Sequence, residues 1–164
     1  MNETTIITIC VSVAVMAFVL FRQLRTKPVK GKSTILIVLA ALGIYQVVIF
    51  LSNLGEDSTV TFGAVALMFA GSAALAVIMA FLRVPSYKLW FENGTAYRKG
   101  TALSVCLWIV AYALHAGYDK AVVLIDPGLE GIVHAVMPIY SAISLGVQRV
   151  LLTKKLSEIG EKSA

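Results

Sequence analysis

The feature that most constrains this chain is a series of five apolar runs, each 18 to 23 residues long. A helix that rises 1.5 Å per residue needs about 20 apolar residues to cross about 30 Å of hydrocarbon. The runs cover residues 4–21, 34–54, 60–82, 101–118 and 131–152, and none of them contains Asp or Glu. The sequence therefore predicts an all-α membrane protein, a bundle of five transmembrane helices that forms one membrane domain over residues 1–164.

The composition agrees with a surface that faces lipid. Hydrophobic residues make up 59% of the chain and charged residues 14%, whereas a soluble globular domain has roughly a quarter charged residues. Disordered, collagen-like and disulfide-stapled proteins are excluded on the same grounds. Cys10 and Cys106 lie singly inside apolar runs, so they form neither a redox motif nor a metal-ligand spacing.

The distribution of basic residues predicts the orientation. The first run follows Met1-Asn2-Glu3 without a basic n-region, which favours a retained span with an external N-terminus over a signal peptide. Threading from that start places 13 of the 14 Lys and Arg residues on internal segments and only Lys120 outside. By the positive-inside rule the protein is N-outside and C-inside. The net charge of +5 comes from basic residues that set the topology and face the head groups of the lipid bilayer. No nucleic-acid partner is therefore predicted.

The internal segment between the third and fourth runs contains a hairpin signal at residues 87–99. Aromatic and β-branched residues stand on both sides of Asn93-Gly94, and Asn-Gly favours a tight hairpin turn. Because an isolated two-stranded hairpin is only marginally stable, we expect this cytoplasmic β-hairpin to lean on the membrane surface or on the basic first loop. Docking of a partner protein is its alternative role.

The external loop between the fourth and fifth runs contains a short apolar segment, residues 121–125, followed by Asp126-Pro127-Gly128. Five residues cannot cross a bilayer. We expect the segment to lie on the outer surface or to cap the bundle, with Asp-Pro-Gly as a turn.

Polar residues lie in stripes along three of the runs. Such residues tend to face the bundle interior or a water-filled cavity, since lipid cannot satisfy them. The stripe on the fourth run includes Thr101 and Ser104 besides the candidates named below. On the fifth run, Ser144 lies near the polar stripe. The candidate ligand-binding residues are Gln46 and Asn53 on the second run, Trp108, Tyr112 and His115 on the fourth, and His134, Tyr140, Ser141 and Gln148 on the fifth.

The third run differs, because Ala66, Ala70 and Ala74 repeat every four residues. Small residues at this spacing let helix backbones approach closely. The third helix is therefore expected to be a packing scaffold that uses its alanine face.

The two histidines of the chain, His115 and His134, are each predicted about 4 to 5 Å below the outer boundary. Pro138 is expected to kink the fifth helix and to free the carbonyl of His134. Three interpretations stay open. The stripes are interhelical hydrogen bonds, or they line an outward-facing cavity for a small molecule or lipid, or His115 and His134 are ligands of a haem iron or a metal.

Several enzyme classes lack their motifs in this sequence. It contains no Gly-rich phosphate loop, no His-Glu-x-x-His and no Gly-x-Ser-x-Gly. No catalytic residue is assigned, and a non-enzymatic protein is favoured. The lack of an acidic residue in any run also argues against a proton-coupled pump or a cation transporter.

Two segments give the chain a family resemblance. One is the basic stretch after the first run, Phe21-Arg22-Gln23-Leu24-Arg25-Thr26-Lys27-Pro28. The other leads into the fourth run, Tyr87-Lys88-Leu89-Trp90-Phe91-Glu92-Asn93-Gly94-Thr95-Ala96-Tyr97-Arg98-Lys99-Gly100. Together they resemble the small bacterial membrane proteins of the CcdC type. The arrangement of spans and loops is similar over most of the chain, and the individual residues are similar over one loop.

This resemblance implies a multi-pass protein of the bacterial cytoplasmic (inner) membrane, in a group associated with cytochrome c maturation and without an established activity. It supplies no catalytic residues. Because the chain has no Cys-x-x-Cys-His motif, a role in cytochrome assembly would be that of a helper or haem handler.

The preferred functional prediction is a protein that binds or moves a small hydrophobic ligand in an outward-facing cavity between the second, fourth and fifth helices, without a cofactor. The alternative is an accessory or regulatory subunit that docks on a membrane protein partner through the hairpin or the alanine face.

Overall fold

The computed structural model describes residues 24–29, 34–53 and 60–161, with the side chains of His134 and Ala135 outside the description. The predicted run 4–21, and with it the count of five spans, lies outside the described residues. The elements are β1 Lys27–Pro28, α2 Thr34–Ser52, α3 Phe62–Arg83, the 3₁₀ helix η1 Val84–Ser86, β2 Tyr87–Glu92, β3 Thr95–Gly100, α4 Ala102–Ile125, the 3₁₀ helix η2 Pro127–Ile132 and α5 Val133–Glu161.

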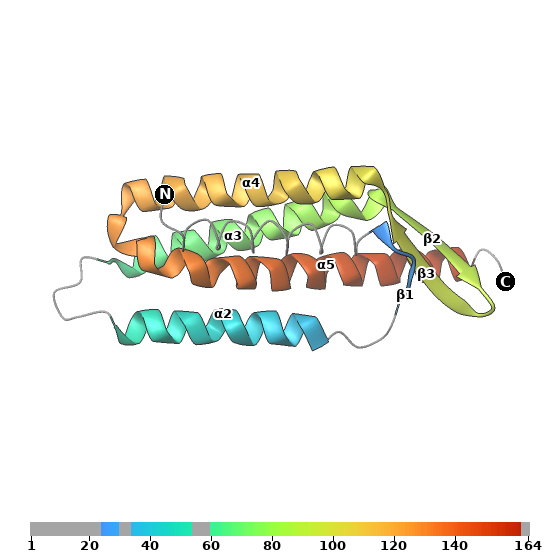
Figure 1. The fold of residues 1–164 in the computed structure, drawn as a ribbon, viewed down its shortest axis with the longest axis horizontal. Helices are drawn as coiled ribbons and strands as arrows, with labels where there is room; N and C mark the ends of the chain where they lie inside the picture. Colours follow the sequence, from blue (N-terminus) through green and yellow to red (C-terminus); the bar gives the residue numbers. More distant parts are fainter. Residues whose placement is uncertain (1–23, 30–33, 54–59, 162–164) are drawn as a thin grey trace, which may run out of the picture.

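Four helices in the described part are long and apolar enough to cross a membrane, as expected of an integral membrane protein. They run along one common long axis (Figure 1), with the small sheet at one end of the bundle and the turn from α4 through η2 to α5 at the other. These are called the sheet end and the α4–α5 end below.

Helices α3 and α5 form the centre of the packing, since α5 lies against α2 and α3, and α3 lies against α5 and α4. The predicted scaffold role of α3 holds, but the predicted face is wrong, because Ala66, Ala70 and Ala74 are all exposed. The face that is buried instead contains Met68, Ser72, Ala76, Met79, Ala80 and Arg83. The buried face of α3 therefore combines small residues with Met68, Met79 and Arg83, and it does not follow the alanine repeat.

Close backbone contact occurs instead where α2 meets α5. Gly43 is the buried residue of α2, and a Cβ atom built on it would overlap Cγ1 of Ile139 and lie 3.2 Å from the Ile139 backbone nitrogen. Only a glycine lets the two helices approach this closely, since any side chain at position 43 would push them apart.

We expect Gly43→Ala to lower the free energy of unfolding by about 1–3 kcal/mol, the usual cost of overpacking a close contact. The matched control is Gly146→Ala in α5, where an added Cβ meets nothing within 4 Å and alanine is the better helix former. Thermal unfolding of both variants in the same lipid nanodiscs provides the comparison. Equal stability of the two would show that α2 does not rest on α5 at this point.

The sheet has the strand order β1-β3-β2, with antiparallel pairs throughout. Trp90 of β2 pairs with Tyr97 of β3, and their rings stack with centroids 5.9 Å apart. The partner expected from the basic first loop is present as β1, in which Lys27 pairs with Arg98. The sheet therefore has three strands where the sequence predicted a two-stranded hairpin.

The turn between β2 and β3 explains why Asn93-Gly94 stands there. Both residues have positive φ, 49° at Asn93 and 72° at Gly94, as a type I′ turn requires. Replacing both with valine should open the hairpin, because β-branched residues are strongly disfavoured at positive φ. Limited proteolysis checks this, with Asn93→Gly as the control that keeps the turn. Unchanged cleavage of the double-valine variant would argue against a folded hairpin.

The fourth span is longer than the sequence predicted. Helix α4 continues to Ile125, so residues 121–125 are its last turns, and the expectation that they form a separate surface segment is wrong. Asp119 and Lys120 interrupt the apolar run without interrupting the helix, because backbone hydrogen bonds do not depend on apolar side chains. The helix ends at Asp126, whose side chain accepts a hydrogen bond from Gly128 N at 3.1 Å.

This boundary has a functional consequence. Asp119 now lies inside a candidate membrane span, Ala102–Ile125, whereas the sequence argument against proton-coupled transport assumed spans without acidic residues. The fourth span therefore does contain an acidic residue.

Candidate functional site

The site begins with the buried face of α4. Residues Ser104, Trp108, Ala111, His115, Asp119 and Val122 are buried at spacings of three and four, which places them on one side of the helix. Of the predicted stripe, Trp108 and His115 point inward in full, and Tyr112 is half-buried.

Helix α5 contributes the opposite wall. Tyr140, Ser144 and Gln148 are buried, and Ser141 is 8% exposed. The Ser141 hydroxyl lies 3.4 Å from the Tyr112 hydroxyl, so the stripes of α4 and α5 meet at this point. The side chain of His134 lies outside the described part of the chain.

The second helix does not complete the constellation as predicted. Gln46 is half-buried, and its Oε1 atom is buried without a hydrogen-bond partner among the described residues. Asn53 is exposed at the end of α2. Neither residue lines the pocket described below.

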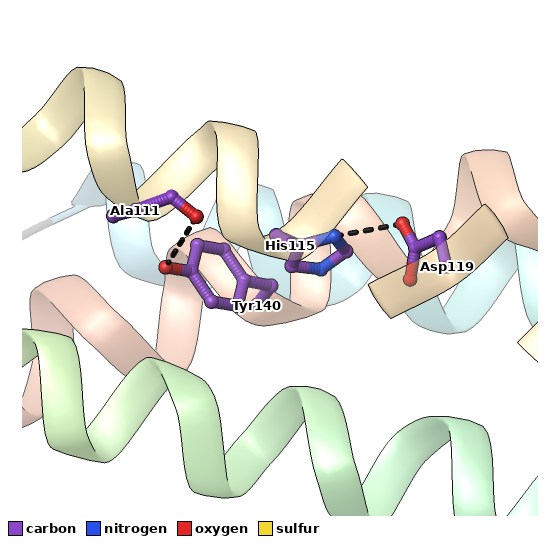
Figure 2. Close-up of polar contacts among 4 residues, drawn as sticks. All are labelled: Ala111, His115, Asp119 and Tyr140. Atoms are coloured by element: carbon purple, nitrogen blue, oxygen red, sulfur yellow. Dashed lines mark hydrogen bonds and ion pairs between the residues drawn. The ribbon is translucent and has the colours of Figure 1, made fainter. Parts of the chain in front are cut away.

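Rings span the space between α4 and α5, whose backbones approach each other in few places. The rings of Tyr140 and His115 contact each other in an edge-to-face arrangement, with their centroids 4.2 Å apart. The Tyr140 hydroxyl donates to the carbonyl oxygen of Ala111 at 3.4 Å (Figure 2). Tyr112 lies 6.2 Å from Tyr140 and 5.3 Å from Trp108. These side chains set the separation of the two helices.

His115 and Asp119 form a buried pair one turn apart on α4. Nδ1 of His115 lies 2.7 Å from Oδ2 of Asp119 (Figure 2). A neutral imidazole has one donor and one acceptor nitrogen, and Nδ1, although close to the carboxylate, makes no hydrogen bond among the described residues. The Nε2 atom has no hydrogen-bond partner among the described residues. Sequence reasoning missed Asp119 because the predicted span ended at residue 118, although the i,i+4 spacing to His115 is a signal for such a pair.

A pocket of about 740 Å³ opens beside this pair, at the α4–α5 end of the bundle. Its walls are mostly apolar, with four ionisable side chains among them. It is lined by His115, Ala116, Asp119, Lys120, Val123, Leu124, Glu130, Val133, Met137 and Pro138. Its size is within the range of small-molecule sites, which combine apolar walls with a few placed polar groups.

A metal centre finds no support in the described residues, where no three His, Cys, Asp or Glu side chains gather. The predicted pairing of His115 with His134 on a haem stays a prediction, since the His134 side chain is not described. A carboxylate, Asp119, lies close to one ring nitrogen of His115, as is common for metal-ligating histidines.

Arg83 is the second residue that sequence reasoning missed. It was counted among the bases of the internal loop, because it follows the third run directly. In the structure it is the last residue of α3 and is fully buried. It lies far from the pocket, toward the sheet end.

Comparisons of the chain with protein-family models, curated proteins and solved structures find no match. The resemblance to CcdC-type proteins therefore stays a prediction, and the site is interpreted from its own chemistry.

Proposed function

We propose that this protein binds a small amphipathic molecule in the pocket between α4 and α5, without catalysing a reaction on it. The observation that carries the proposal is the pocket itself, which joins apolar walls to the buried His115–Asp119 pair. An intramembrane ionisable pair is costly, and such residues usually mark a binding site or a pathway.

The ligand class follows from the unpaired ring nitrogens of His115. Neither ring nitrogen of His115 has a hydrogen-bond partner among the described residues, and a neutral imidazole has one nitrogen that accepts a hydrogen bond. The pocket therefore requires a hydrogen-bond donor for His115 and an apolar surface for its walls. A neutral molecule with an apolar body and one hydroxyl group provides both. Val123, Leu124 and Met137 supply the apolar contacts.

The proposed location is a bacterial cytoplasmic membrane, with the sheet end inside and the pocket open to the outside. In the described residues, the sheet end has Lys88, Arg98 and Lys99, whereas Asp126 and Glu130 lie at the α4–α5 end. This distribution follows the positive-inside rule.

Cysteine labelling tests the orientation. In a background without Cys10 and Cys106, a membrane-impermeant maleimide added to intact cells should label Gly128→Cys and leave Asn93→Cys unlabelled. Labelling of Asn93→Cys after lysis shows that this position is reactive. The reverse pattern would invert the topology and place the pocket on the cytoplasmic side.

Binding of 2-naphthol in nanodiscs tests the function, with 2-methoxynaphthalene as the matched probe that lacks a hydroxyl donor. We expect 2-naphthol to bind roughly three- to tenfold more tightly, the worth of one hydrogen bond. His115→Phe should abolish this preference, and Trp90→Phe in the distant sheet should keep it. Protein-free nanodiscs correct for partitioning into lipid. Equal affinity of the wild-type protein for both probes would refute the assigned role of His115.

Haem binding is a second candidate, favoured by the closeness of the Asp119 carboxylate to His115. Its test is the visible spectrum of the purified protein with added haem, oxidised and reduced. A Soret band that is lost in His115→Ala and in His134→Ala would support it. No band at any haem concentration would remove it.

An accessory subunit is the remaining alternative, favoured by the exposed alanine stripe at Ala66, Ala70 and Ala74. Under that function, substitutions at Trp90 or Tyr97 or on the stripe would abolish activity. Substitutions at Gln46, Tyr112 or His134 would spare it.

A further inference from the structure

Arg83 is a buried cation at the junction of α3, α4 and α5. Its exposed fraction is 0%. Its Nε atom donates to the Met79 carbonyl oxygen at 3.0 Å, and Nη2 donates to the Ser144 hydroxyl. The guanidinium carbon lies 3.8 Å from the centroid of the Trp108 ring. All three helices thus hold one positive charge in place.

No carboxylate of the described chain pairs with Arg83. Helix α3 contains no acidic residue. On α4 the first is Asp119, eleven residues past Trp108 and therefore about 16 Å along the helix. On α5 the first is Glu158, fourteen residues past Ser144, or about 21 Å. A buried charge without a counterion is strongly unfavourable.

Unused hydrogen-bond donors surround the guanidinium. Among the described residues, three donor atoms, Nη1 of Arg83, Nε1 of Trp108 and Nε2 of Gln148, are buried and have no partner, and the same is true of one acceptor, Oε1 of Gln148. Gln148 is 1% exposed and lies one turn beyond Ser144 on the same face of α5. Buried polar groups are nearly always hydrogen-bonded, and the three free donors outnumber the one free acceptor, so this set lacks a further group that accepts hydrogen bonds.

We propose that a small monovalent anion of halide size binds between Arg83, Trp108 and Gln148. An anion satisfies the donors and compensates the charge, whereas a water molecule does only the first. The guanidinium packs directly on the indole and both are fully buried, which favours a single ion over a bulky oxyanion. This site lies toward the sheet end and is separate from the α4–α5 pocket.

The test uses Trp108 as its own reporter. The chain contains two tryptophans, so Trp90→Phe leaves Trp108 alone. Iodide quenches indole fluorescence on contact. In nanodiscs of the Trp90→Phe protein, at constant ionic strength with bulky gluconate as the replaced anion, we expect saturable quenching by iodide and relief by chloride. The neutral quencher acrylamide should have little effect, because Trp108 is 1% exposed.

Two variants in the same background assign the site. Gln148→Leu removes one donor and should weaken iodide binding about tenfold. Arg83→Lys keeps the charge but replaces the planar fork with a point charge, and should weaken binding as well. Gly146→Ala, which meets nothing within 4 Å, should leave the titration unchanged. Quenching that stays linear in iodide, or saturable quenching that neither Gln148→Leu nor Arg83→Lys alters, would overturn the proposal.

Discussion

Replacing His115 with leucine is expected to lower the free energy of unfolding by about 3 kcal/mol or more, because it leaves the buried carboxylate of Asp119 without its polar neighbour. Asp119 is buried against His115, with 2.7 Å between Oδ2 and Nδ1. Its other oxygen, Oδ1, has no partner among the described residues. Without His115 the carboxylate keeps its desolvation cost and loses its compensating contact.

The double variant His115→Leu/Asp119→Leu separates this effect from lost packing. Removing both partners of a buried pair is often neutral or stabilising, so most of the lost stability should return. Unfolding in mixed micelles, followed by circular dichroism, measures all three proteins. If the double variant is as unstable as the sum of the single changes, the pair has no special coupling and the imidazole matters only as a filler of volume.

The second large effect is expected at Tyr140. This side chain is fully buried and contacts His115, Tyr112 and the Ala111 carbonyl. Tyr140→Ala removes the ring that separates α4 from α5, and truncation of a buried aromatic residue typically costs about 3–5 kcal/mol. The pocket wall should collapse with it.

Tyr140→Phe is the matched control, since it keeps the ring and loses only the 3.4 Å hydrogen bond to Ala111. Its expected cost is below about 1 kcal/mol. The same unfolding measurement compares the two variants. Similar losses for both would mean that the hydroxyl, rather than the ring, holds the helices in place.

The elements with a strong local signal were predictable from the sequence. The apolar runs from residue 34 onward became helices because their length and composition leave few alternatives. The Asn93-Gly94 turn was predictable because few residues tolerate positive φ at two successive positions. The inward direction of Trp108 and His115 followed from helical spacing alone.

Other features depend on tertiary contacts that no local pattern contains. Whether Ala66 or Met68 faces the core is decided by the neighbours of α3, and here bulky side chains from α4 and α5 fill the interface. Arg83 was assigned to the loop because it follows an apolar run, but its side chain is buried against Trp108 of α4 and Ser144 of α5. Asp119 was assigned to the loop because hydropathy, rather than backbone hydrogen bonding, defined the end of the span.

The most direct test of the ligand site is to determine where the ligand attaches. A diazirine derivative of 2-naphthol, irradiated with the protein in nanodiscs and mapped by peptide mass spectrometry, should label α4 between Ala116 and Leu124 and α5 between Val133 and Pro138. Excess 2-naphthol should suppress this labelling, and 2-methoxynaphthalene should suppress it less. Labelling concentrated on the lipid-facing side of α2 or on the alanine stripe of α3, and insensitive to competitor, would contradict a binding site between α4 and α5.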